Sequence, residues 1–172
     1  MSRGDELWLR RKWTLRSHGR QVVFVKKPVE STEHVLMKAM LWALYLPLFP
    51  DIRVEVPIAD RYKPDLVQLN EVGRPLFWAE AGRVSRSKID SLARRYPDTH
   101  FAIAKWNSDL SPLADAVTKA LKQRRRRAPI DLLAFPEDSA ERFFGLSGEI
   151  TLSFGSIEFR RLGAAPNTRR QA

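Results

Sequence analysis

The chain has 172 residues, of which 44% are hydrophobic, so it is long enough for one domain with a buried core and too apolar for a disordered protein. It has no cysteine, which excludes disulfides and thiolate metal sites. No stretch approaches the roughly 20 apolar residues of a membrane span and no secretory signal is visible, so we expect a cytoplasmic protein. The formal net charge of +10 favours a polyanionic partner, of which nucleic acid is the commonest.

The N-terminal part of the chain predicts a β-hairpin followed by a buried helix. A β-favouring run around Phe24, preceded by a turn at Gly19, indicates two strands over residues 7–16 and 21–27. Ser31 or Thr32 can cap a helix over residues 33–46, where apolar residues recur at helical spacing.

Short strands and helices alternate over the rest of the chain, which predicts parallel pairing with right-handed crossovers. A capping box of Ser87 and Asp90 indicates the start of one of these helices. We expect a single domain over residues 1–162 and a disordered tail over 163–172. The expected strands are 52–58, 64–70, 75–82, 100–106 and 129–135, the expected helices are 87–95, 113–125 and 139–144, and strands 149–154 and 156–161 form a closing hairpin.

Two carboxylates fall where a buried site is expected. Asp65 begins one strand, and Glu80 lies inside the most apolar strand on the same face as Trp78. A carboxylate among apolar neighbours is costly unless a cation or a hydrogen-bond donor compensates it. An ion pair with an arginine is one interpretation, and a functional carboxylate pair is the other.

Residues in the first turns of two helices extend this acidic pair. Lys88 lies in the first turn of the helix after Glu80, where the helix dipole disfavours a cation, so its side chain is a candidate to face the carboxylates. Glu33 lies in the first turn of the earlier helix, where the dipole alone explains an acid. His34 beside it could approach the same site.

The order of a helix with Glu33, a strand with Asp65, a strand with Glu80 and a second helix resembles the core of PD-(D/E)xK nucleases. Within that superfamily, the segments EHVLMKAMLW (33–42), AIAKWNS (102–108) and TLSFGSIEF (151–159) look like those of the YaeQ family. The resemblance covers about residues 20–162. It implies an α/β, restriction-endonuclease-like fold, a mixed sheet flanked by helices with N- and C-terminal β-hairpins.

The resemblance also implies a chemistry, which is cleavage of phosphodiester bonds in DNA or RNA. Mg²⁺ or Mn²⁺ would be bound by Asp65, Glu80, the carbonyl of Ala81 and, directly or through water, Glu33. Such a metal would activate a bound water, and Lys88 would orient that water or neutralise the scissile phosphate.

The chain departs from the nuclease motif at one position. The lysine of the E-x-K form would stand two residues after Glu80, where this sequence has Gly82, as YaeQ sequences do. Lys88 is the first candidate to replace that lysine, and Lys105 is the second. Gly82 also motivates the alternative function, a nuclease-like fold that binds nucleic acid or protein without catalysis.

Basic residues provide candidates for holding a phosphate backbone. A solvated, solubilising surface is the alternative interpretation of the same charges. The candidates are Arg83, Arg86, Arg124, Arg125, Arg126 and Arg127.

Overall fold

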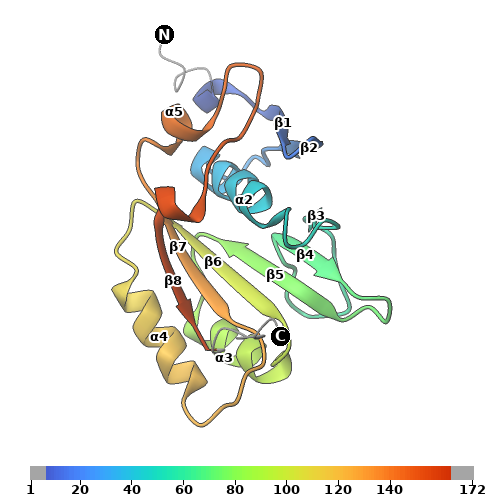
Figure 1. The fold of residues 1–172 in the computed structure, drawn as a ribbon, viewed down its shortest axis with the longest axis vertical. Coiled ribbons are helices and arrows are strands. Elements are labelled where there is room, and N and C mark those ends of the chain that lie inside the picture. The colour runs from blue at the N-terminus through green and yellow to red at the C-terminus, as the bar shows by residue number, and fades with distance from the viewer. Residues whose placement is uncertain (1–6, 164–172) are drawn as a thin grey trace, which may run out of the picture.

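A six-stranded mixed sheet runs through the computed structural model, which describes residues 7–163 (Figure 1). Its strand order follows the chain, β3-β4-β5-β6-β7-β8. The first three strands pair antiparallel, β5, β6 and β7 pair parallel, and β8 returns antiparallel to β7. The strands are β3 (Arg53–Val54), β4 (Leu66–Leu69), β5 (Pro75–Ala81), β6 (His100–Trp106), β7 (Ile130–Phe135) and β8 (Glu158–Leu162).

Helices cover both faces of this sheet. Helix α2 (Thr32–Tyr45) lies on one face, and α3 (Arg86–Arg95) and α4 (Ser111–Leu121) lie on the other (Figure 1). Alternate residues of β5 therefore enter two separate cores: Phe77 packs with α2, whereas Trp78 packs with α3 and α4. The helices α3 and α4 are the crossovers that the parallel strand pairs require.

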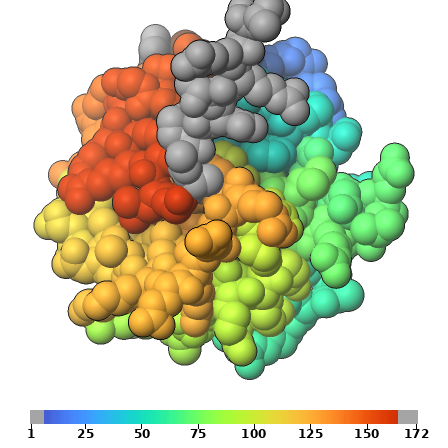
Figure 2. Space-filling view, turned by 60° about the horizontal axis from the view of Figure 1, so that its bottom comes forward, coloured from blue at the N-terminus to red at the C-terminus, as the bar shows by residue number. Residues whose placement is uncertain are grey.

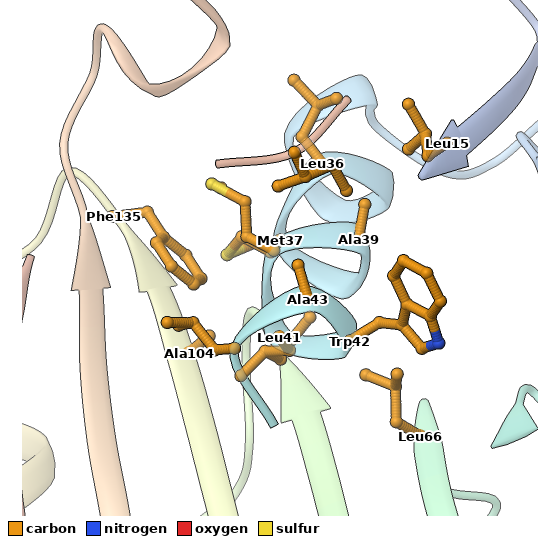
Figure 3. Packing of buried hydrophobic residues seen from close by; sticks show 14 of the residues in the cluster. Leu15, Leu36, Met37, Ala39, Leu41, Trp42, Ala43, Leu66, Ala104 and Phe135 are labelled. Atoms are coloured by element: carbon orange, nitrogen blue, oxygen red, sulfur yellow. The ribbon is translucent and has the colours of Figure 1, made fainter. Parts of the chain in front are cut away.

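Helix α2 is buried around its whole circumference. Figure 3 shows Met37 on the side of Phe135 and Leu41 on the side of Ala104, both of the sheet, while Leu15 lies beside the helix on its other side. Leu15 belongs to an N-terminal hairpin of β1 (Lys12–Ser17) and β2 (Arg20–Val25), as predicted. A helix that is apolar on all sides needs such a second cover.

The structure corrects the predicted bounds of two strands, the first strand of the N-terminal hairpin and β3 of the sheet. Residues 7–9 are helical, so the first strand is shorter than expected. The strand expected over 52–58 ends at Val54, because Glu55 has a φ of +54° and Pro57 has no N–H for a strand ladder.

The two helices behind the sheet also differ from their predicted bounds. Ser85 caps α3, because its hydroxyl accepts a hydrogen bond from the backbone N–H of Lys88 at 3.2 Å. The predicted capping box of Ser87 and Asp90 is therefore wrong. Helix α4 ends at Leu121 rather than at residue 125, so the arginine cluster follows the helix instead of extending it.

The expected C-terminal hairpin is absent from the described residues. Residues 149–154 form no strand with β8; instead, the N–H of Arg16 in β1 donates to the carbonyl of Gly148, and the N–H of Ile150 donates back to Arg16. Gly148 has a φ of +87°, and a Cβ there would lie 2.4 Å from the carbonyl oxygen of Thr14. The close approach to β1 therefore needs glycine. The short helix α5 (Ser139–Phe143) precedes this segment.

The predicted hairpin between β4 and β5 is present. Asn70 accepts hydrogen bonds from the N–H groups of Val72 and Arg74, and Gly73 supplies a φ of +77°. Figure 2 shows this tip (green) standing out from the body of the molecule.

Two further predictions concern membrane-spanning helices and the C-terminal tail. Within residues 7–163 no helix is long and apolar enough to cross a membrane. The predicted disordered tail begins at Gly163, and its remaining residues lie outside the described part of the chain.

Candidate functional site

Asp65 and Glu80 lie at the edge of the sheet where β5 and β6 end. Because β4 and β5 are antiparallel, the start of β4 is beside the end of β5. The N–H of Asp65 donates to the carbonyl of Ala79 at 3.1 Å, which places Asp65 across from Glu80. Strand pairing thus brings together two carboxylates that are far apart in the sequence.

The Asp65 carboxylate is held by two donors. Its Oδ2 accepts a hydrogen bond from the backbone N–H of Ala81 at 2.7 Å, and its Oδ1 lies 3.4 Å from Nε2 of His34. Burial alone would raise the pKa of Asp65, but the hydrogen bonds from His34 and Ala81 and the charges of His34 and Lys38 outweigh it and lower this pKa. Asp65 is therefore a fixed, ionised carboxylate.

Glu80 is only 7% exposed and shares one oxygen between two donors. Its Oε1 lies 2.7 Å from Nε1 of Trp78 and 2.8 Å from Nζ of Lys88. Burial raises the pKa of Glu80 and the charge of Asp65 adds to it, against the lowering effects of Lys88 and Trp78. The compensating cation is thus Lys88, from the first turn of α3, rather than an arginine.

Glu33, the third predicted acid, does not join this pair. Its side chain makes no hydrogen bond or ion pair with any residue of the described part of the chain. In its place, His34 reaches the site from the same turn of α2, with Nε2 also 3.5 Å from Oε1 of Glu30. Sequence reasoning missed Glu30, which stands directly before the helix cap.

A buried lysine organises the acids on the α2 side. Lys38 is 1% exposed, and its ammonium is bonded to Glu30 and, at 2.8 Å, to Oε1 of Glu55. Burial would lower the pKa of Lys38, but the hydrogen bonds and charges of the two glutamates raise it. The four-residue spacing of His34 and Lys38 was the signal available in the sequence, because residues so spaced share one face of a helix. Glu30 lies before the cap of that helix, so helical periodicity did not indicate it.

Gly82 has a structural reason to be glycine. Its φ is +84°, and a Cβ there would lie 3.4 Å from Nδ1 of His34. A lysine at this position would be strained. Lys105, the second candidate, donates from Nζ to the carbonyl of Gly82 at 2.5 Å, and its pKa is lowered by burial and by the charge of Arg83.

The candidate phosphate-binding arginines separate into two groups. Arg83 and Arg86 are exposed and form no ion pair with a residue between 7 and 163. In the four-arginine cluster, Arg124 pairs with Asp90 and Arg127 with Asp98, and Arg126 is half-buried, whereas Arg125 is exposed. The cluster is therefore not one free basic patch.

Arg126 closes the C-terminal end of α3. Its guanidinium donates to the carbonyls of Ala93, Tyr96 and Thr99 at 3.0, 3.0 and 2.6 Å, and burial lowers its pKa to about 10. We expect Arg126→Met to lower the free energy of unfolding by about 2–3 kcal/mol, because it leaves these carbonyls unsatisfied. Urea unfolding followed by circular dichroism measures this. Arg125→Met is the matched control and should change stability by less than about 0.5 kcal/mol; equal effects of the two variants would contradict this role.

The site offers two carboxylates for a metal ion. Among residues 7–163 no group of three or more histidine and acidic side chains is placed to hold an ion alone. Mg²⁺, however, is commonly bound by one or two carboxylates together with substrate phosphates and water. Asp65 and Glu80 supply the carboxylates that a site of that kind needs, whereas Ala81 contributes its N–H to Asp65.

Comparison with known proteins identifies the fold. No protein-family model and no curated protein matches the sequence. The crystal structure of YaeQ protein from Pseudomonas syringae matches with a TM-score of 0.57 and 17% identity, over 83% of this chain and 80% of that one. YaeQ protein from Xanthomonas axonopodis pv. citri matches with a TM-score of 0.54 and 13% identity, over 77% of each chain. The resemblance predicted from the sequence is thereby confirmed at the level of structure, and this chain has the fold of YaeQ proteins.

Proposed function

We propose that the chain is a divalent-metal-dependent nuclease that cleaves phosphodiester bonds at Asp65 and Glu80. Under this proposal, α2, the antiparallel strands β3–β5, α3 and β6 form a PD-(D/E)xK core. The observation that carries the proposal is the convergence of two carboxylates and a lysine, with Lys88 Nζ 2.8 Å from Glu80. These are the residue types that metal-assisted phosphodiester hydrolysis requires.

The residues around the carboxylates have distinct roles in this proposal. Mg²⁺ or Mn²⁺ held by Asp65 and Glu80 would supply an activated water and neutralise charge on the phosphate. His34 and the N–H of Ala81 hold Asp65 in its orientation. Lys88 compensates Glu80 in the free protein and is close enough to turn toward a bound phosphate.

A second function is supported by the same ion pairs. The carboxylates of Glu80 and Asp65 are already compensated by Lys88 and His34, and Gly82 stands where the motif would have lysine. A protein of this kind would bind nucleic acid through its basic surface, with Asp65 and Glu80 acting only in structure. Metal dependence separates the two functions.

The test is titration of Mg²⁺ and Mn²⁺ by calorimetry, followed by incubation with plasmid DNA, single-stranded DNA and RNA. We expect wild-type protein to bind one ion and to cleave at least one substrate. Glu80→Gln and Asp65→Asn should each remove metal binding and reduce cleavage by about a hundredfold or more, because each removes a charged ligand.

Two controls make this result specific. Glu71→Gln removes a carboxylate at the exposed tip of the β4–β5 hairpin and should leave binding and cleavage unchanged. Glu33→Gln tests the predicted water-mediated ligand, and weaker metal binding in that variant would support it. Nucleic-acid binding without metal dependence or cleavage in the wild type would instead establish the non-catalytic function.

A further inference from the structure

The loop between β3 and β4 is fixed to α3 by a buried aspartate. The Asp60 side chain is 1% exposed and accepts hydrogen bonds from the Tyr96 hydroxyl at 2.5 Å and from Nη2 of Arg95 at 3.2 Å. It also accepts from the backbone N–H of Tyr62 at 2.8 Å. Asp60 therefore holds the backbone of Tyr62, and the half-buried ring of Tyr62 packs beside the core between the sheet and α3.

Three cations surround the ring of Tyr62. The guanidinium carbons of Arg61 and Arg95 lie 4.6 and 5.9 Å from the ring centroid, and Nζ of Lys88 lies 5.2 Å from it. The Lys88 ammonium is the same one that contacts Glu80. Tyr62 is therefore one side chain away from the proposed catalytic carboxylate.

Two of the three cations over the ring have carboxylate partners, and one has none among the described residues. Lys88 is paired with Glu80 and Arg95 with Asp60, whereas Arg61 forms no ion pair with a residue between 7 and 163. A cation over an aromatic ring at a partly exposed site stabilises by only about 0.5–1 kcal/mol. Within the described part of the chain, the Tyr62 hydroxyl makes no hydrogen bond. A phosphate placed here would supply the carboxylate-like partner that Arg61 lacks.

Further basic side chains lie on the segments that flank the ring. Lys63 follows Tyr62 directly, and Arg83 and Arg86 precede and begin α3; all three are exposed and unpaired among the residues the structure describes. Cations that hold a backbone, next to an aromatic ring, are the chemistry by which proteins bind single-stranded nucleic acid.

We propose that Tyr62 stacks on a base of single-stranded nucleic acid while Arg61, Lys63 and Lys88 hold its phosphates. This inference rests on nucleic acid being the substrate of the proposed function, but not on cleavage. A base can stack on a side chain only when it is free of its own duplex stack, so the surface selects single strands over duplex.

The experiment measures binding of a fluorescein-labelled 12-residue oligothymidylate by anisotropy, at several salt concentrations and in EDTA, so that metal and cleavage play no part. Tyr62→Leu is expected to weaken binding by at least about fivefold, the lower end of the effect of a stacked base, with an unchanged salt slope. Tyr62→Phe keeps the ring and should bind within about twofold of wild type. Lys63→Met should reduce the salt slope by about one, because it removes one phosphate contact.

Controls separate this inference from the proposed function. Lys119→Met removes an exposed charge from α4 and should leave binding unchanged, and circular dichroism verifies the fold of each variant. Equal affinity of Tyr62→Leu and wild type, or equal binding of single strand and duplex, overturns the stacking inference even if metal is bound and substrate is cleaved. Tyr62-dependent binding by a protein that neither binds metal nor cleaves supports the stacking inference and contradicts the nuclease.

Discussion

Asp131→Ala is expected to lower the free energy of unfolding by about 3–5 kcal/mol, the range for removing one partner of a buried ionic cluster. Asp131 is 0% exposed in β7 and accepts hydrogen bonds from the Tyr45 hydroxyl at 2.7 Å and from Nε2 of His100 at 2.5 Å. Arg161 of β8 donates to both carboxylate oxygens, from Nε at 2.7 Å and Nη2 at 2.9 Å. One carboxylate thus joins α2, β6, β7 and β8, and its loss leaves the buried Tyr45 hydroxyl without its acceptor.

The same carboxylate predicts a pH dependence of stability. Burial would raise the pKa of Asp131, but the hydrogen bonds from His100 and Arg161 outweigh it and lower this pKa below its ordinary value. A carboxylate with a lowered folded pKa stabilises the protein above its unfolded pKa of about 3.9, and this stabilisation is lost as the pH falls through the folded value.

Urea unfolding at pH 7 and at pH 3 measures both the loss of stability on replacing Asp131 and its dependence on pH. The difference in stability between wild type and Asp131→Asn should be large at pH 7 and smaller at pH 3. Asp115→Asn, at an exposed position of α4, is the matched control and should cost less than about 0.5 kcal/mol at either pH. A difference between wild type and Asp131→Asn that stays the same at both pH values would contradict the role of the ionised carboxylate.

Lys38→Met is expected to lower the free energy of unfolding by about 3 kcal/mol or more, although methionine fills a similar volume. The change leaves Glu30 and Glu55 without their shared cation, and Asp65 lies close to Glu30 through His34. Repulsion between these carboxylates adds to the cost of burying them. The effect should therefore come from the unpaired acids rather than from lost packing.

A double-mutant cycle with Glu30→Gln tests this explanation. If Lys38 acts by compensating Glu30, the double variant is more stable than the sum of the two single losses indicates, with a coupling of about 1–3 kcal/mol. Lys38→Met with Glu71→Gln is the matched control, since Glu71 lies at the exposed tip of the hairpin, and that pair should be additive. Additivity in the Glu30 cycle as well would show that Lys38 acts through packing alone.

Local patterns in the sequence determined much of the fold of this chain. The β-favouring run around Phe24 and the turn at Gly19 predicted the N-terminal hairpin, and the alternation of strands and helices predicted the parallel pairs around β6. The apolar spacing of α2 predicted its burial. These features depend on which side of a helix or strand is apolar, and that property follows from the spacing of apolar residues that are close in the sequence.

The same local reasoning predicted the candidate carboxylates and one of their partners. Asp65 and Glu80 were marked by their places on strands, and Lys88 by its unfavourable position in the first turn of a helix. The structure brings Lys88 to Glu80 and Asp65 to the end of the same strand. Whether they act in catalysis stays a prediction.

Tertiary structure alone decided which polar groups meet across elements. Glu30 and Glu55 converge on Lys38, and Asp131 collects donors from three other elements, only once strand order and register are set. The segment over residues 149–154 has the composition of a strand, yet it pairs with Arg16 of β1 instead of with β8. Local periodicity specifies that a side chain is buried, whereas its partner depends on contacts between residues that are distant in the chain.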